Sequence, residues 1–250
     1  MVIQFLHRGK SRTADLSKPM DISIPLVAES SQVNCFYAPL FEVSPVVMGS
    51  FIGDTQQGGA VNFMNVRLNP HGNGTHTECI GHIAVEPFSI HRELREFHHV
   101  AKLITLYPSI ADNGDRVILY ESIKEHISKN DDVVALIVRT LPNHTDKLHR
   151  QYSGTNPPYF HHQAIAYLVA CGIQHLLVDL PSVDREEDGG QLLAHRAYWQ
   201  YPDAIRRTAT ITELIFVPNE IQDGVYLLNL QIASFDIDVS PSKPILYDIT

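Results

Sequence analysis

The order strand, helix, strand between residues 133 and 180 most limits the folds open to this chain. Residues 133–138 form a short, β-branched apolar run without polar alternation, which is typical of a strand buried on both faces. Asn156-Pro157-Pro158 predicts the start of a helix, and Gly172 predicts its end. Residues 173–180 form a second apolar strand, so the two strands are expected to pair in parallel through a right-handed crossover. This pattern favours an α/β fold.

Further strands are predicted on both sides of this unit. Apolar and polar residues alternate over 21–26 and over 64–68, and a longer alternating strand is expected near the end, over 225–235. Residues 1–17 are mixed and polar and are interpreted as a loosely attached lead-in segment. Because no internal repeat or Gly/Ser linker is present, residues 18–250 are expected to form one α/β domain with extra strands at its N-terminal side.

The composition narrows the classes of partner and compartment. Nineteen Lys and Arg residues against 28 Asp and Glu give a formal net charge of −9. Proteins that bind nucleic acids or anionic membranes usually carry clustered basic residues instead. Neither a nucleic acid nor an anionic membrane is therefore expected as the main partner.

The three cysteines form no CxxC pair, which argues against a disulfide framework and a Cys-rich zinc site. The longest clean apolar run has six residues, far short of the roughly 20 that span a bilayer. We expect a soluble, cytoplasmic protein.

The densest chemical signal is the segment 71–82, which holds three histidines and a glutamate. In an extended segment, residues two apart point to the same side, so His76 and Glu78 can aim a nitrogen and an oxygen at one cation. Imidazole and carboxylate ligands without thiolate suit Zn²⁺, Mn²⁺ or Fe²⁺. A polar surface loop that happens to be rich in histidine is the alternative, but the clustering with His71 and His82 favours a metal site.

Two weaker signals lie further along the chain. The strand at 173–180 ends in an acidic turn, and a lone histidine, His195, follows. Catalytic groups favour loops just past the C-terminal ends of parallel strands, yet a solvated loop and an ordinary helix histidine explain these residues equally well. Glu213 stands beside an apolar stretch and would, taken alone, be expected to face solvent.

Taken together, these segments resemble the cyclase family of metal-dependent hydrolases, which includes bacterial kynurenine formamidase and isatin hydrolase. Residues 74–82 are similar to the family motif His-x-Gly-Thr-His-x-Asp-x-Pro-x-His. The resemblance implies a single swivelling β/β/α-type domain with a mixed sheet and helices packed on it. Further segments match the family in the same order along the chain. They are Asp21 to Leu26, Arg139-Thr140, Asp179 to Asp184 followed by His195, Glu213-Leu214, and Ser240 to Ile245.

The resemblance implies a role for each matching residue. His76 corresponds to a ligand of a first metal, and Glu78 to an aspartate that binds or bridges two metals. His195 corresponds to a ligand of a second metal, and Glu213 to a bridging carboxylate that can also act as a base. His82 corresponds to a histidine that shuttles protons.

The chain departs from the family pattern around the first histidine. His71 is implied as the ligand that accompanies His76, but it precedes His76 by five residues where the family has four, with Asn73 as the inserted residue. The glutamate at position 78 is one methylene longer than the family aspartate. Glu220 is a weaker substitute for Glu213 as the late carboxylate.

The resemblance implies metal-assisted hydrolysis of a small molecule at a formamide, amide, cyclic amide or ester bond. One or two divalent cations, Zn²⁺ or Mn²⁺, are expected in each chain, and a homo-oligomer, dimer or tetramer, is implied. The ordinary pKa of histidine, near 6.5, suits His82 for proton transfer in both directions. Formamidases of the family usually have an aromatic residue where this chain has Met20, so an aryl formamide is not assumed.

Two alternatives remain open. His76, Glu78 and the distant His195 also fit the two-histidine, one-carboxylate triad of an Fe(II) oxygenase, although such enzymes usually have an all-β jelly roll. A non-enzymatic ligand-binding member of the same fold would explain the shifted His71 and the glutamate at position 78.

Overall fold

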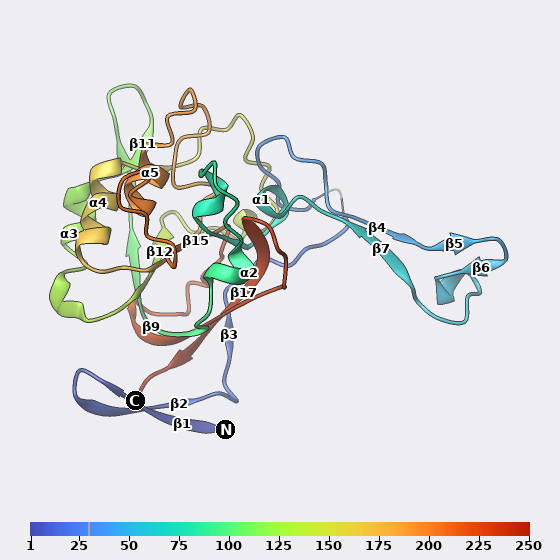
Figure 1. Cartoon of the computed structure of the whole chain (residues 1–250), viewed down its shortest axis with the longest axis horizontal. Helices are drawn as coiled ribbons and strands as arrows, with labels where there is room; N and C mark the ends of the chain where they lie inside the picture. Colours follow the sequence, from blue (N-terminus) through green and yellow to red (C-terminus); the bar gives the residue numbers. More distant parts are fainter. Residues whose placement is uncertain (30) are drawn as a thin grey trace.

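A closed mixed sheet forms the centre of the computed structural model, which describes residues 1–29 and 31–250 (Figure 1). Strands hydrogen-bond in the order β16-β9-β12-β14-β15-β8-β17-β3, and β16 also pairs with β17, which closes the sheet into a barrel. The predicted mixed α/β fold with extra N-terminal strands is confirmed. The strands of this sheet are β3 (Met20–Asp21), β8 (His76–Glu78), β9 (His98–Leu106), β12 (Ala135–Thr140), β14 (His175–Val178), β15 (Thr210–Glu213), β16 (Gly224–Ile232) and β17 (Val239–Asp248).

The predicted strand–helix–strand unit is β12, α4 (His162–Ala170) and β14, and the two strands pair in parallel. The helix begins later than Pro158, because residues 159–160 first form β13 (Tyr159–Phe160), which pairs with β11 (Arg116–Ile118). The helix ends as predicted near Gly172, whose φ of 87° lies in the left-handed region that favours glycine.

Apolar residues fill two layers, one on each face of the barrel wall. On β12, Leu136 and Val138 pack outward under the helices, whereas Ala135 and Ile137 pack into the barrel. Both faces are covered, which explains why this strand lacks polar alternation in the sequence. The helices near the wall are α2 (Ile90–Glu93), α3 (Tyr120–Lys124), α4 and α5 (Leu193–Trp199). Among the described residues, no helix combines the length and the apolar character needed to cross a membrane.

The prediction of a loosely attached N-terminal segment is wrong. β1 (Val2–His7) and β2 (Lys10–Asp15) form an antiparallel hairpin, and Ala14 in β2 is buried. The backbone of Thr13 exchanges two hydrogen bonds with that of Thr250. The N-terminal hairpin is therefore attached to the last residues of the sequence. The strand predicted over 21–26 is reduced to β3, because its later backbone groups bond elsewhere, such as the Ile24 N–H, which donates to Thr75 Oγ1.

A two-stranded arm projects from the barrel, between the N-terminal hairpin and the histidine-rich segment 71–82 in the order of the chain (Figure 1). The predicted strand at 64–68 is confirmed as β7 (Met64–Arg67), which pairs with β4 (Glu42–Pro45). A short hairpin of β5 (Val47–Met48) and β6 (Phe51–Ile52) forms the tip. The chain then returns to the barrel and enters the single turn α1 (Pro70–Asn73).

Candidate metal centre

Strand β8 brings the first predicted ligands together at the barrel wall. His76 lies opposite Glu213 of β15, and Glu78 lies opposite Ile211, so His76, Glu78 and Glu213 share one face of the sheet. Thr77 points to the other face, where its hydroxyl lies 2.8 Å from that of Thr212. His76 and Glu78 therefore point to the same side of β8, as predicted, and the register of β8 with β15 adds Glu213 to that side.

His76 is completely buried and oriented by the backbone. Its Nδ1 lies 2.9 Å from the carbonyl oxygen of Gly74 and donates to it, so Nε2 carries the free lone pair. Nε2 lies 3.3 Å from Oε2 of Glu213. Glu213 is 3% exposed, which contradicts the expectation that this residue would face solvent. Its Oε1 accepts a hydrogen bond from the Val183 N–H at 2.9 Å, which orients the carboxylate.

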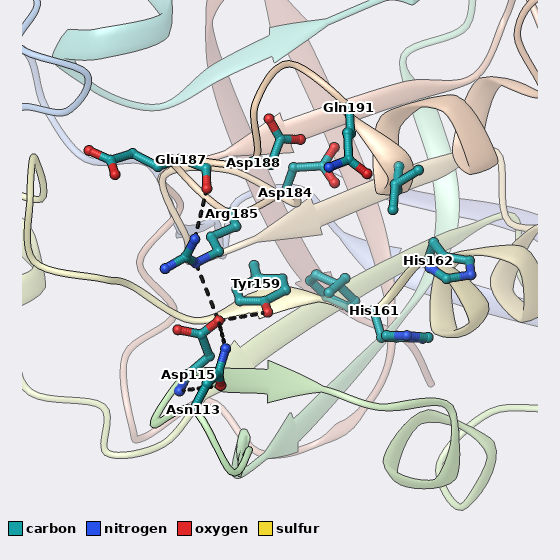
Figure 2. Close-up of a pocket in the computed structure, with 12 residues that line it drawn as sticks. Asn113, Asp115, Tyr159, His161, His162, Asp184, Arg185, Glu187, Asp188 and Gln191 are labelled. Carbon is teal, nitrogen blue, oxygen red and sulfur yellow. Dashed lines mark hydrogen bonds and ion pairs between the residues drawn. The ribbon is translucent and has the colours of Figure 1, made fainter.

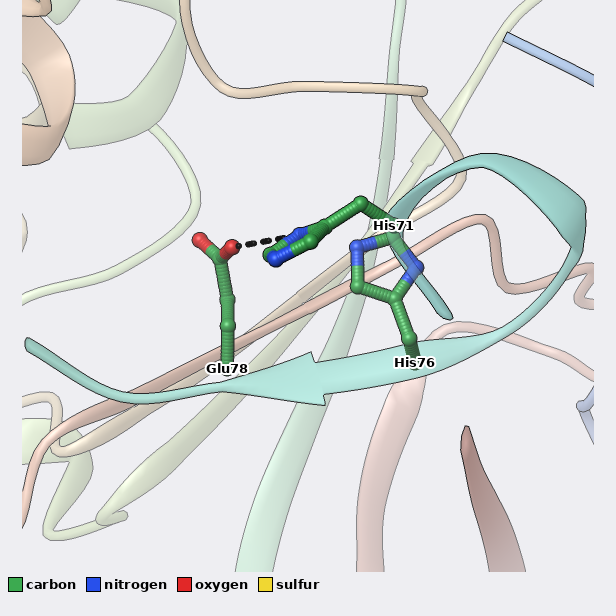
Figure 3. Close-up of side chains that lie close together, drawn as sticks. All are labelled: His71, His76 and Glu78. Carbon is green, nitrogen blue, oxygen red and sulfur yellow. Dashed lines mark ion pairs between the residues drawn. The ribbon is translucent and has the colours of Figure 1, made fainter. Parts of the chain in front are cut away.

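Glu78 lies at the centre of the cluster and has no exposed surface. Oε1 is 3.1 Å from Nε2 of His195, and Oε2 is 3.3 Å from Nδ1 of His71. Figure 3 shows the contact between Glu78 and His71, with His76 beside them. Burial favours the neutral acid, but His82, His195 and His71 outweigh it and hold the pKa of Glu78 well below its usual range. Glu78 is therefore a carboxylate surrounded by imidazoles.

Helix α5 supplies His195 from the far side of the cluster. Its Nδ1 is 2.6 Å from Oδ2 of Asp184. Oδ1 of the same carboxylate accepts a hydrogen bond from the Ala194 N–H, and Oδ2 accepts one from the His195 N–H. Burial opposes protonation of His195, but Asp184 and Glu78 outweigh it and raise the pKa of His195 to about 10. Asp184 thus fixes both the helix start and the imidazole ring. Sequence reasoning assigned it no role, although it ends the block that starts at Asp179.

His71, His82 and Asp238 complete the cluster. Asp238, like Asp184, was not predicted from the sequence to have a role. The rings of His71 and His82 lie 4.4 Å apart, and Asp238 Oδ2 is 2.9 Å from Nε2 of His71 and 3.5 Å from Nδ1 of His82. Burial opposes protonation of His71, but Asp238 and Glu78 raise its pKa to about 10. The Cys79 N–H donates to the carbonyl oxygen of Asp238, which holds this residue beside the motif. The only sequence signal was its place just before the Ser240 block.

The donor set fits a divalent cation. Within the described part of the chain, the buried atoms His76 Nε2 and Glu78 Oε2 have no hydrogen-bond partner. Such atoms are costly unless a proton, water or cation meets them. One ligand atom from each of His71, His76 and Glu78 lies within 4.8 Å of the others, and Glu78, His82 and His195 form a second such group. A third group consists of His71, His82 and Asp238.

The turn before β8 accommodates the residue that is inserted relative to the family motif. The extra residue before His76 lies in the turn α1. The side chain of Asn69 caps this turn by accepting a hydrogen bond from the Gly72 N–H. The turn brings His71 back to Glu78. Glu220, the weaker candidate carboxylate, is exposed on a turn and does not border the cluster.

The cluster opens into a cavity of about 480 Å³. His71, His82, His195 and Glu213 contribute to its wall. Met20 does not, because its side chain packs with the apolar residues inside the barrel. The remaining lining residues are Phe36, Tyr37, Ala38, Pro39, Asn69, Ser182, Asp184, Arg185, Glu186, Asp188 and Leu192.

A second cavity, of about 440 Å³, is also lined by residues of the acidic loop that follows β14 (Figure 2). Arg185 belongs to the walls of both cavities, but its guanidinium turns to the second one, where Nε lies 3.2 Å from Asp115 Oδ2. His161 and His162 also line this second cavity. The acidic loop therefore contributes side chains to both cavities.

Solved structures with the same fold include several hydrolases. A predicted metal-dependent hydrolase from Bacillus stearothermophilus superposes with a TM-score of 0.63 at 15% identity, covering 92% of this chain and 98% of the other. Isatin hydrolase A from Labrenzia aggregata, bound to benzyl benzoate, superposes with a TM-score of 0.65 at 14% identity, covering 92% and 93%. Isatin hydrolase A from Ralstonia solanacearum gives 0.62 at 12% identity, covering 92% and 91%.

Sequence comparison identifies the family directly. No curated protein matches the chain. The family model named Cyclase, however, matches residues 14–185, which is more than half of the chain and includes β8, β12 and β14. The matched region contains His71, His76, Glu78 and His82. This chain belongs to the cyclase family.

Proposed function

We propose that the protein is a metal-dependent hydrolase that cleaves a C–N bond of a formamide, amide or cyclic amide, or an ester bond. The observation that carries this proposal is the buried cluster in which His76 Nε2 and Glu78 Oε2 have no hydrogen-bond partner within the described residues, beside a cavity of about 480 Å³. Membership in the cyclase family supports it. The fold shared with isatin hydrolases supports the class of reaction.

Five side chains would hold the metal: His71, His76, Glu78, His195 and Glu213. Glu78 reaches towards two histidines with its two oxygens, and Glu213 reaches towards His76, so either carboxylate is placed to serve one or two cations. Nitrogen and oxygen donors of this kind suit Zn²⁺ or Mn²⁺. When bound, such a cation makes hydroxide available at neutral pH and polarises a carbonyl group.

His82 is the proposed proton shuttle. Its side chain is 30% exposed and lines the cavity, so a substrate nitrogen or oxygen can approach it. Its Nδ1 is 3.5 Å from Asp238 and 3.7 Å from Glu78, which leaves Nε2 for the leaving group. His82 also belongs to one candidate ligand group with Glu78 and His195, so the metal content of a His82 variant separates the two roles.

The chain shapes the cavity around this chemistry. Asp184 holds His195 in one ring orientation, and the Gly74 carbonyl does the same for His76. Such outer contacts fix which nitrogen is available to a ligand. Phe36 and Tyr37 form part of the cavity wall, and they favour a substrate with some apolar surface.

The fold of the chain argues against the alternative of an Fe(II) oxygenase, which usually has an all-β jelly roll. The chain forms a closed mixed barrel with parallel strands and packed helices, and it matches the Cyclase family. The ligand-binding alternative keeps the same fold and predicts binding without turnover. It is therefore an outcome of the experiment that tests hydrolysis.

The decisive experiment measures metal per chain and hydrolysis together. Protein purified without chelator is assayed for bound metal and for turnover of a panel of formamides, lactams and esters. We expect stoichiometric metal in the wild type and its loss in Glu78→Ala, with Glu220→Ala as the matched control on an exposed glutamate. Wild-type protein without metal would overturn the metal proposal. Bound metal without turnover of any member of the panel would favour the ligand-binding alternative.

A further inference from the structure

Asp238, immediately before β17, fixes which nitrogen of His71 faces the metal centre. The contact of 2.9 Å between Asp238 Oδ2 and His71 Nε2 has the geometry of a hydrogen bond. A carboxylate only accepts, so Nε2 of His71 carries the proton and donates it to this bond. In the neutral ring the lone pair therefore lies on Nδ1, on the opposite side from Asp238.

Nδ1 of His71 faces two buried atoms that have no partner. It lies 3.3 Å from Oε2 of Glu78, yet this oxygen accepts no hydrogen bond within the described residues, and Nε2 of His76 has no partner there either. One ligand atom from each of the three residues lies within 4.8 Å of the others. Figure 3 shows these three side chains together. Donor atoms that crowd one point without bonding to each other are the arrangement expected around a cation.

The backbone brings the Asp238 carboxylate to this position. Strand β17 pairs with β8, and the Cys79 N–H donates to the carbonyl oxygen of Asp238 at 3.0 Å. Gly81 makes room beside it, because a Cβ at this position would lie 3.1 Å from the Cβ of Asp238 and would clash with the carbonyl oxygen of Phe88. The carboxylate is therefore held at the metal centre by main-chain contacts of its own strand.

The charge of Asp238 acts on imidazoles alone. Among residues 1–29 and 31–250, Asp238 forms ion pairs with His71 and His82 and with no lysine or arginine. A carboxylate that accepts from one nitrogen of a ligating histidine fixes the ring and makes the other nitrogen a stronger donor. Asp184 has this relation to His195, where Nδ1 contacts the carboxylate and Nε2 faces the cluster. In His71 the two nitrogens exchange these places.

We propose that Asp238 is a positioning residue that makes His71 bind the cation through Nδ1, whereas His76 and His195 bind through Nε2. This inference rests on the metal-binding part of the proposed function and is independent of the bond that is cleaved. The same carboxylate lies 3.5 Å from Nδ1 of His82, so it also joins a metal ligand to the proposed proton shuttle.

The first test identifies the nitrogen that binds. The whole protein is crystallised with Zn²⁺ alone, and the anomalous signal of zinc locates the ion relative to each imidazole ring. We expect Zn²⁺ at Nδ1 of His71, with Nε2 still on Asp238. Zn²⁺ at Nε2 of His71, or bound directly to Asp238, would overturn the inference.

The second test measures Zn²⁺ affinity by competition with a chromophoric chelator. Asp238→Ala is expected to weaken binding by about 10–100-fold, the range typical of a residue that orients a ligand. Asp238→Asn should lose less, because its amide oxygen can still accept from Nε2 of His71. Asp236→Ala is the matched control two residues away, since Asp236 pairs with Arg92 and not with a histidine of the cluster. Denaturant unfolding of the metal-free variants checks that each is folded.

The outcomes separate this inference from the proposed function. Unchanged Zn²⁺ affinity in Asp238→Ala would overturn the inference, as would an equal loss in Asp236→Ala, which would assign the effect to the segment as a whole. If Asp238→Ala does not fold, the position of Zn²⁺ in the wild-type crystal still decides the outcome. Wild-type protein that binds no metal would overturn the proposed function together with this inference, whereas Zn²⁺ bound through the other nitrogen of His71 would overturn this inference alone.

Discussion

Glu213 lies directly opposite His76 across the β8–β15 pair, with its Oε2 3.3 Å from Nε2 of His76. The two residues are 137 positions apart in the chain, and only the antiparallel register of two short strands joins them. Glu78 occupies the same face two residues further along β8. Strand register, rather than local sequence, therefore decides which carboxylates meet the histidines of the motif.

Replacing Glu213 by glutamine should weaken metal binding by at least about 100-fold, more than the roughly 10–100-fold typical of residues outside the ligand shell. The reason is that the neutral amide keeps the shape of the side chain but removes the charge beside His76. Metal affinity is measured by competition with a chromophoric chelator. Glu220→Gln, on an exposed turn, is the control and should bind metal as the wild type does. Equal affinity in Glu213→Gln would remove this residue from the ligand set.

Asp184→Asn should lower metal affinity or turnover by about 10–100-fold, because the carboxylate that fixes the His195 ring is lost. It should also lower the free energy of unfolding of metal-free protein by about 1 kcal/mol, since Asp184 accepts the N–H groups of Ala194 and His195 in the first turn of α5. Metal titration and denaturant unfolding measure the two effects separately. Asp203→Asn, at an exposed aspartate, is expected to change neither quantity.

His82→Ala is expected to retain metal and to lose at least about 100-fold in turnover, the range typical of general acid–base catalysis. Metal content and the rate constant are measured on the same preparation. His91→Ala, at an exposed histidine on α2, serves as the control. Loss of metal in His82→Ala would instead assign His82 to the ligand group that it forms with Glu78 and His195.

The stability of the protein should fall as the pH drops from about 6.5 towards 3, because of a histidine pair outside the metal centre. His175 is buried, its ring centroid lies 3.9 Å from that of His99, and burial followed by repulsion from His99 lowers the pKa of His175 to about 3. In this window the unfolded chain binds a proton at His175 that the folded chain does not, so protonation favours unfolding. The lost stability is on the order of 4 kcal/mol.

Denaturant unfolding of metal-free protein across this pH range checks the effect. His175→Asn keeps a polar partner for Thr210, which lies 2.8 Å from Nδ1 of His175, but it cannot titrate, so its stability should depend less steeply on pH. His91→Asn should follow the wild-type curve, because this histidine is exposed. Parallel curves for wild type and His175→Asn would show that other groups cause the acid sensitivity.

Some structural predictions failed because contacts distant in sequence outweighed local patterns. Residues 1–17 look like a polar lead-in, yet β2 is held in place by Thr250 at the far end of the chain. The residues from Pro158 look like the first turn of a helix, but they first pair with β11 and the helix begins at His162. In both cases the distant partner, Thr250 for β2 and β11 for β13, lies outside any local window of sequence.

The sequence by itself determined the strand–helix–strand core, the spacing of His76 and Glu78, and the order of blocks that identifies the family. These features are local or periodic, and elementary geometry translates them directly into structure. Tertiary structure alone decided the burial of Glu213, the orientation of His195 by Asp184, and the place of Asp238 beside His71. It also decided that the segment around β7 stands free as an arm. The physical reason is that pairing between strands distant in sequence sets which side chains meet and which faces stay open, and no single segment encodes that pairing.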